Sequence, residues 1–288
     1  MGITASDVVS DDDVRAIVEE IRNQYYQARR PFREHDATDI NSNSFDFPVS
    51  NSDIDGEAVE IPEGADYPRA EKDYSEVSAA YTKYGVEVTI SDEAVDDGYI
   101  DVEMDAEEDM VRAEEKRMDT VAFGVLSGNT NSAGPIDANS NSNNTIEYAD
   151  IVQARQQAFT DELSLSDTVL VAAGQNMADF LNMDEFTQAS ELGDQVITQG
   201  VLPGGNLVGT EALLGVVGDV PVYLSNSGSF SQGQAFMVDT SNFGWESVRW
   251  DTEIDQYRED SNDQDVWKIR GRWDWVATQP SANIEINT

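Results

Sequence analysis

The spacing of hydrophobic residues predicts two long amphipathic helices in the first half of the chain. The first follows Ser10 and ends before Pro31, with apolar residues at Val14, Ile17, Val18, Ile21 and Tyr25. The second follows Ser91, and its apolar positions recur at steps of three or four as far as Leu126. At 1.5 Å per residue it would be roughly 50 Å long, more than a small domain needs.

Alternating apolar and polar residues predict a strand before the second helix. Residues 74–90 alternate, with a change of phase between Tyr81 and Tyr84, so we expect one long strand with a bulge or bend. Residues 36–73 show no helical period and contain three prolines and two glycines, Pro48, Pro62, Pro68, Gly56 and Gly64. A protruding hairpin fits this segment.

The second half of the chain mixes short helices with strands. Residues 146–163 predict a helix with Ile151, Val152, Arg155, Phe159 and Leu163 on one side. Residues 168–172 and 220–225 predict strands, and residues 175–182 a short helix.

The chain from Ala235 onward reads as strand and turn. Residues 266–276 are the clearest strand, with Trp267, Ile269, Trp273 and Trp275 on one face, and Ile284 and Ile286 predict a last strand. The whole pattern predicts an α+β fold.

Charge excludes several functions. The 288 residues include 57 acidic and 17 basic residues, one histidine (His35) and no cysteine, for a net charge of −40. There is no basic footprint for nucleic-acid recognition, no thiol for a disulfide, a zinc site or a nucleophile, and no run near the roughly 18 apolar residues that cross a bilayer. We therefore expect neither sequence-specific DNA binding nor a membrane contact.

The composition also indicates a salt-rich environment. Lysine occurs only at Lys72, Lys83, Lys116 and Lys268, while acidic residues are spread along the chain. In about 1 M salt the Debye length is about 3 Å, so exposed charges repel one another little. We expect a halophilic source, a haloarchaeon or its virus; a merely acidic mesophilic protein is the alternative.

The order of these elements resembles the major capsid protein of tailed double-stranded-DNA viruses, a fold shared by lambdoid-phage capsids and encapsulins. Three stretches carry the resemblance. They are YGVEVTISDEAVDD at Tyr84–Asp97, the run Thr145–Asn182 with TIEYADIVQARQQAF and DTVLVAAGQNMADFLN, and GDVPVYLSNS at Gly218–Ser227 before a strand-rich end closing with QPSANIEI.

The resemblance implies a division of the chain into five parts. Residues 1–45 would be an N-terminal arm with an amphipathic helix, and residues 46–73 an E-loop lying over a neighbouring subunit. Residues 74–165 would form a peripheral domain with a spine helix at about 91–126, and residues 166–230 an axial domain. The return strands of residues 231–288 would rejoin the peripheral domain.

The same resemblance implies a structural function rather than an enzymatic one. Copies of the chain would form the pentamers and hexamers of an icosahedral shell that encloses viral DNA in the virion, assembled in the host cytoplasm. Portal and decoration proteins would be further partners. Few residues precede the first helix, so scaffolding would be a separate protein or the mechanism differs. Lys72 is the only lysine of the proposed E-loop, at its base, so we expect no crosslink there.

An encapsulin-like compartment that encloses a cargo enzyme is the alternative to a virus shell. A halophilic enzyme is less favoured, because one histidine, no cysteine and no tight carboxylate motif leave only distant carboxylates to pair. We expect no catalytic, cofactor-binding or metal residues and no cofactor.

Several local motifs resemble known binding sites, but we expect no site at any of them. Asp97, Asp101 and Asp105 stack at steps of four and could hold Mg²⁺ or Ca²⁺, but a solvated acidic face is favoured. Asp260–Asp265 lacks the glycine and glutamate of an EF-hand. The glycine-rich Gly200–Gly209 lacks the lysine of a P-loop and fits a flexible axial-domain loop.

Other motifs have simple explanations. Met1–Ser6 fits the N-myristoylation pattern, which the prokaryotic context disfavours, and the sequon at Asn143 is explained by chance. We expect His35 to be an exposed polar residue of the arm. We expect the tryptophans of residues 266–276 to be core against the spine helix rather than a sugar platform.

Overall fold

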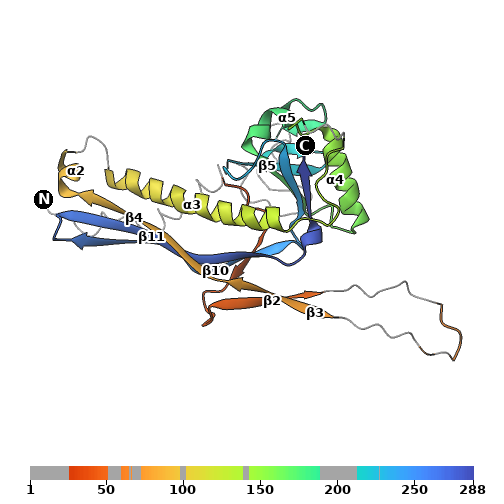
Figure 1. Ribbon diagram of the computed structural model, residues 1–288, viewed down its shortest axis with the longest axis horizontal. Coiled ribbons are helices and arrows are strands. Elements are labelled where there is room, and N and C mark those ends of the chain that lie inside the picture. Colours follow the sequence, from red (N-terminus) through yellow and green to blue (C-terminus); the bar gives the residue numbers. More distant parts are fainter. Residues whose placement is uncertain are drawn as a thin grey trace.

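The structure is a computed structural model that describes residues 26–50, 60–64, 66, 73–97, 102–138, 143–188, 213–226 and 228–288. It contains two main sheets and a separate two-stranded hairpin (Figure 1). The described part has no helix long and apolar enough to cross a membrane.

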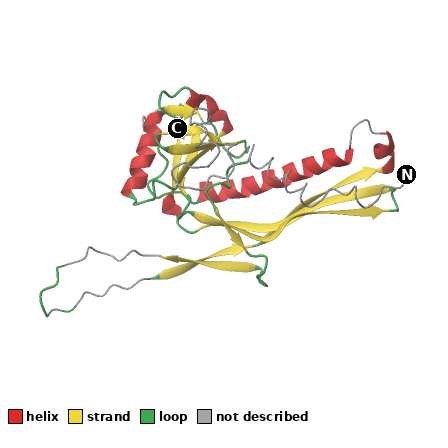
Figure 2. Ribbon diagram, turned by 180° about the vertical axis from the view of Figure 1, so that it is seen from behind, coloured by secondary structure: helices red, strands yellow, loops and turns green. Residues whose placement is uncertain are grey.

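A long helix packs along the four-stranded sheet. The strand order is β1 (Arg33–Asp36), β10 (Gly244–Glu259), β11 (Gln264–Ala277) and β4 (Thr82–Ser91), and helix α3 (Val102–Gly128) lies on one face in both views (Figures 1 and 2). The predicted apolar face of β11 is buried beneath the helix, at Trp267, Ile269, Trp273 and Trp275. These tryptophans are therefore core, as expected.

The strand predicted over residues 74–90 is two strands in two different sheets. β3 (Tyr74–Ala80) pairs antiparallel with β2 (Ser44–Ser50), whereas β4 pairs with β11. The chain leaves one sheet for the other at Tyr81, which is buried, so the predicted change of phase marks a change of partner.

The β2–β3 hairpin projects away from both sheets (Figure 2). Gly64 has φ +85°, which suits the predicted turn at Glu63-Gly64, while the other predicted turn, Asp55-Gly56, lies outside the described residues. The hairpin predicted for this segment is confirmed at its base.

The predicted spine helix is divided. Helix α2 (Asp92–Asp97) and helix α3 are separate elements, so the single helix over residues 91–126 is wrong in its continuity. The start is as expected, because the Ala94 backbone N–H donates to Ser91 Oγ at 3.3 Å. Helix α3 alone has 27 residues and is about 40 Å long.

The six-stranded sheet has the order β12 (Asn283–Asn287), β9 (Gln234–Asp239), β5 (Thr168–Ala173), β8 (Val220–Ser225), β7 (Leu213–Val217) and β6 (Phe186–Gln188). Every residue of β5 is buried. Because β9 and β12 belong to this sheet while β10 and β11 belong to the other, residues 231–288 contribute to both sheets.

Helices surround the six-stranded sheet. They are α4 (Tyr148–Thr160), the 3-10 turn η1 (Gly174–Asn176) that leads into α5 (Met177–Leu181), and a second turn, η4 (Pro280–Ala282). The predicted inner side of α4 is partly wrong: Ile151 is buried, but Val152 and Phe159 are exposed. Ala154 and Ala158 face inward instead, because small side chains let the helix approach the sheet closely.

The predicted N-terminal helix lies almost wholly in residues 1–25, outside the described part. Its expected last residues are not helical: residues 28–31 form turns that lead into β1. We call residues 26–32 the strap.

Candidate assembly site at the arm junction

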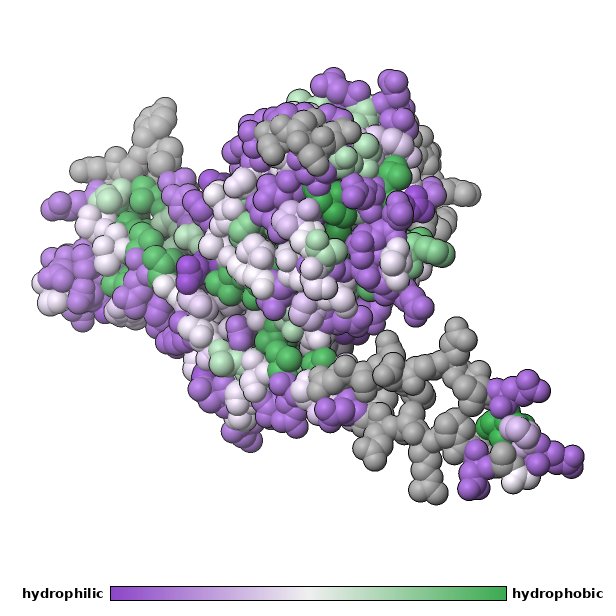
Figure 3. All heavy atoms as spheres, turned by 45° about the vertical axis from the view of Figure 1, so that its right-hand side comes forward, coloured by the Kyte–Doolittle hydropathy of each residue, from purple (hydrophilic) through white to green (hydrophobic). Residues whose placement is uncertain are grey.

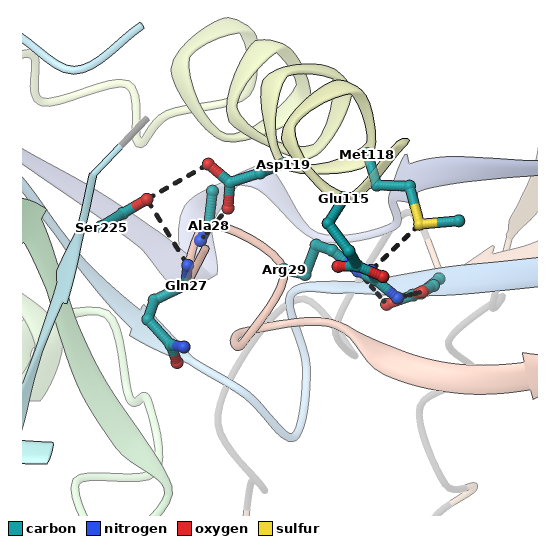
Figure 4. Close-up of polar contacts among 8 residues, drawn as sticks. Gln27, Ala28, Arg29, Glu115, Met118, Asp119 and Ser225 are labelled. Atoms are coloured by element: carbon teal, nitrogen blue, oxygen red, sulfur yellow. Dashed lines mark hydrogen bonds and ion pairs between the residues drawn. The ribbon is translucent and has the colours of Figure 1, made fainter. Parts of the chain in front are cut away.

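The strap lies where helix α3 meets both sheets (Figure 4). We call this place the arm junction; it is formed by Gln27, Ala28, Arg29, Glu115, Asp119, Ser225 and Glu246. Asp119 of α3 is fully buried, and its Oδ1 accepts the Ala28 backbone N–H at 2.7 Å. Its Oδ2 accepts the hydroxyl of Ser225, at the end of β8, at 3.1 Å. The Gln27 backbone N–H donates to the same hydroxyl at 3.4 Å. One carboxylate thus joins the strap, the long helix and the six-stranded sheet.

Arg29 fixes the strap to the four-stranded sheet. Its guanidinium pairs with Glu115 of α3 at 2.8 Å and with Glu246 of β10 at 2.5 Å, and it lies 5.5 Å from the centre of the Trp275 ring. Burial alone would lower the pKa of Arg29, but the charges of Glu246 and Glu115 raise it above its ordinary value. Arg29 is therefore a permanent cation between two buried anions.

The remaining strap residues fill hydrophobic positions between the sheets. The Arg30 guanidinium lies 4.8 Å from the centre of the Tyr223 ring, and the Phe32 ring lies 5.1 Å from that of Phe243. Ala28, Phe32, Tyr223 and Phe243 all belong to the core cluster shared by α3 and both sheets. The strap is therefore an integral part of the core.

His35 anchors the root of the β2–β3 hairpin. Its ring lies 4.4 Å from Phe45 and 5.0 Å from Phe47, and its Nδ1 is 2.9 Å from Ser247 Oγ. The expectation of an exposed histidine was wrong, because the aromatic side chains of β2 pack around the ring and leave it half-buried. Ser247 is fully buried and also meets the Tyr81 hydroxyl at 2.9 Å. The serine–histidine pair is therefore part of the packing at the hairpin root.

A second buried carboxylate borders a groove between α3 and β4. Glu114 is 5% exposed, and its Oε1 occupies the space above Gly271, where a Cβ would lie 2.6 Å from it. Burial, and then the neighbouring charge of Glu115, raise the pKa of Glu114 to about 7. The groove has a volume of about 320 Å³ and is lined by Tyr84, Gly85, Val86, Ala113, Glu114 and Arg117. Glu114 is thus an acid that titrates near neutral pH.

An exposed charge cluster closes the far end of the four-stranded sheet. Arg258 of β10 forms a bidentate pair with Asp92, at 2.5 and 2.7 Å, and its guanidinium also lies 3.6 Å from Asp265. The acidic turn at Asp260–Asp265, already rejected as an EF-hand, surrounds this arginine. One cation of the protein therefore compensates part of the negative charge of this turn.

The motifs set aside in the sequence do not form a site in the described residues. Asp105 is exposed, whereas Asp101 and the side chain of Asp97 lie outside the described part. No group of three metal-ligating side chains occurs among the residues that the structure describes. Asn143 is exposed. The predictions on Met1–Ser6, Lys72 and Gly200–Gly209 fall outside the described residues.

The sequence alone does not predict the contacts of the arm junction. In the sequence, Arg29 resembles the basic end of the predicted N-terminal helix. Glu115 and Asp119 resemble residues on the charged faces of the second predicted helix. A signal was present: both acids lie at helical spacing from Val111, Met118 and Ala122, which are buried. Sequence spacing shows that these acids share the inner face, but it cannot show that a cation from 86 residues away meets them.

Comparisons with known proteins agree with this architecture. No curated protein sequence matches the chain. The mature capsid of bacteriophage PhiM1 superposes with a TM-score of 0.61 at 13% identity, covering 100% of this chain and 91% of that chain. A Mycobacterium phage Che8 structure gives 0.63 at 12% identity, covering 91% of both chains.

A virus-like particle from Pyrococcus furiosus also superposes, with a TM-score of 0.57 at 9% identity, covering 96% of this chain and 98% of that chain. These likenesses show the expected tailed-virus capsid fold. The family of phage capsid proteins matches residues 75–284, which is most of the chain. The chain therefore belongs to the phage capsid protein family.

Proposed function

We propose that this protein is the major capsid protein of a tailed virus, a structural protein that assembles into an icosahedral shell of pentamers and hexamers around double-stranded DNA. The projecting hairpin carries the proposal. Within the described residues, β2 and β3 form strand pairs only with each other and pack on the four-stranded sheet at their root, where Phe47 stacks on Trp245, so the outer end of the hairpin has no sheet of its own chain to lie on. A neighbouring subunit would supply that support.

The parts of the chain take their roles from this assembly. Residues 1–45 would be the arm and residues 46–73 the E-loop over a neighbour. The peripheral domain would span residues 74–165, the axial domain residues 166–230, and the return strands residues 231–288. The arm junction would join these parts, because buried contacts of the strap hold α3 and both sheets together.

The net charge of the chain indicates the salt concentration at which the shell would assemble. At −40 per subunit, copies repel one another unless salt screens them, and we propose a halophilic virus of archaea. An acidic inner wall would repel packaged DNA rather than bind it. Portal, decoration and separate scaffold proteins would complete the virion, and assembly would take place in the host cytoplasm.

An encapsulin-like shell around a cargo enzyme is the second candidate. A virus-like particle from Pyrococcus furiosus shares the fold, but the family match is to phage capsid proteins. The content of the particles distinguishes the two candidates, because a viral shell from infected cells holds DNA and a compartment holds protein.

Electron microscopy of the purified protein in molar salt tests the proposal. We expect uniform polyhedral shells, whereas discrete small oligomers would contradict a capsid. Dilution toward about 10 mM salt lengthens the Debye length to about 30 Å. We then expect the shells to swell or dissociate, and light scattering that stays constant would contradict the salt adaptation.

A further inference from the structure

Residues 127–160 are one of two stretches of this acidic chain that carry few charges; the other, residues 195–238, holds only Glu211 and Asp219. Residues 127–160 hold four of the 57 acidic and 17 basic residues, Asp137, Glu147, Asp150 and Arg155. Four charges in 34 residues is less than half of the 26% found in the whole chain. The stretch runs from the end of α3 to the end of α4.

Two of these four charges are used inside the subunit. Asp150 is 2% exposed and accepts the backbone N–H groups of Ala138, at 2.7 Å, and Glu147, at 2.8 Å. Arg155 donates to the Gly218 carbonyl and lies 3.8 Å from Asp219. Little charge is left to face outward.

Arg155, whose side chain is 35% exposed and lies 3.8 Å from Asp219, borders the exposed side of α4, four residues before Phe159. That exposed side itself carries no charge. It consists of six exposed residues, which we call the α4 outer face: Ala149, Val152, Gln153, Gln156, Phe159 and Thr160. Phe159 is 73% exposed and Val152 is 46% exposed, and a spacing of seven places them on one line along the helix. Exposed large hydrophobic residues that line up in this way mark an interaction surface.

Three other exposed hydrophobic residues, Met104, Trp250 and Tyr257, have charged neighbours. Met104 stands between Glu103 and Asp105, the Arg272 guanidinium lies 5.3 Å from the Trp250 ring, and Lys268 lies near Tyr257. In the view that brings the α4 side forward, hydrophobic residues form separate patches among hydrophilic ones (Figure 3). The α4 outer face therefore combines exposed apolar area with the absence of charge.

These properties select the kind of partner. A nucleic acid requires lysine or arginine to meet its phosphates, and this face has neither. Two copies of a chain with a net charge of −40 repel one another wherever both present carboxylates. Two such copies can approach closely at an uncharged surface, where glutamine side-chain amides donate and accept hydrogen bonds without adding charge.

We infer that the α4 outer face is a contact between copies of this chain. The inference rests on the proposed shell and adds to it a surface with named residues. Phe159 would be the central apolar contact, with Gln153 and Gln156 hydrogen-bonding beside it.

A charge substitution tests the face against a matched control. Phe159→Glu and Met104→Glu each add one negative charge at an exposed apolar position, 73% and 51% exposed respectively. Sedimentation of both variants and the wild type over a range of salt concentrations gives the yield of shells. We expect Phe159→Glu to lose at least about tenfold in shell yield in molar salt, and Met104→Glu to match the wild type. Equal thermal melting of the unassembled subunits shows that both variants fold.

A cysteine substitution reports on the same face without adding charge. The chain has no cysteine, so Gln156→Cys is the single target for a maleimide. We expect labelling to be at least about tenfold slower in shells than in dissociated subunits.

The outcomes separate the inference from the proposed function. A wild type that forms no shells overturns the proposed function. Shells formed equally well by Phe159→Glu, or a Gln156→Cys thiol that reacts equally in shells and subunits, overturn this inference alone. So does an equal loss of shells in Phe159→Glu and Met104→Glu, because added charge anywhere would then suffice.

Discussion

The interiors of the two sheets differ in kind. One face of the six-stranded sheet is covered by buried aliphatic residues with Phe180, whereas four carboxylates are buried along α3, Glu107, Glu114, Glu115 and Asp119. The strap binds to the second interior, through Arg29 and the backbone of Ala28. Along α3, buried carboxylates therefore meet a segment distant in sequence, whereas the buried Asp150 and Asp239 beside the six-stranded sheet accept hydrogen bonds from backbone N–H groups. An unpaired carboxylate on α3 would exclude wrong partners of the strap.

The largest effect is expected from Arg29→Met. Removal of the cation leaves Glu115 and Glu246 buried without compensation, which costs about 3–5 kcal/mol of the free energy of unfolding. Chemical denaturation of the unassembled subunit measures this loss. Adding Glu115→Gln and Glu246→Gln to Arg29→Met should restore much of the stability. If Arg29→Met alone is as stable as the wild type, the ion pairs do not hold the strap.

Leu170→Ala probes the apolar interior for comparison. Leu170 is fully buried in β5, and truncation of a buried leucine costs about 2–5 kcal/mol. Because no charge changes, we expect the loss of stability to be the same in low and high salt. A loss that varies strongly with salt would show that the two interiors are not as distinct as their residues indicate.

The next largest effect on stability is expected from the titration of Glu114. Its folded pKa of about 7 lies above the value of about 4.3 in an unfolded chain, so the folded state holds the proton more tightly. The contribution to stability is complete below a pH of about 4.3 and is lost as the pH rises through about 7, by about 4 kcal/mol at most.

Glu114→Gln removes this pH dependence. Urea denaturation of wild type and variant from about pH 4.5 to about pH 8 should show a difference that changes by up to that amount, in favour of the variant at high pH. A difference in stability that stays constant over this pH range would show that folding does not raise the pKa of Glu114. Glu108→Gln, on the same helix, is the matched control.

The smallest effect is expected at the exposed end of the sheet. Arg258→Gln removes the pair with Asp92, but exposed pairs are screened and contribute little. We expect no measurable change of the melting temperature in molar salt. A clear loss there would mean that this exposed cluster stabilises the sheet as the buried ions do.

Local patterns predicted the elements better than their partners. Alternation in residues 266–276 and the all-apolar run at residues 168–172 specified β11 and β5, because each strand keeps one relation to the core along its length. The phase change at Tyr81 was visible, but the fact that β3 and β4 join different sheets depends on partners far along the chain. The inner side of α4 was misjudged because Ala154 and Ala158 bury more completely than the larger Val152 and Phe159.

The arm junction was the least predictable part. Arg29 and Glu246 are separated by 217 residues, and no local pattern couples them. His35 likewise owes its surroundings to β2 and β10. Charged residues of low apparent interest in the sequence become central once the topology brings them together.

The Asp119 contacts have a consequence for the geometry of a closed shell. A polyhedron built from one chain must fit the same subunit into five-fold and six-fold rings. Because Asp119 binds both the strap and Ser225 of the six-stranded sheet, the body of the subunit resists bending between its two halves. In the proposed shell, the adjustment for unequal curvature would then fall to the hairpin, whose root packs around His35 and Phe47.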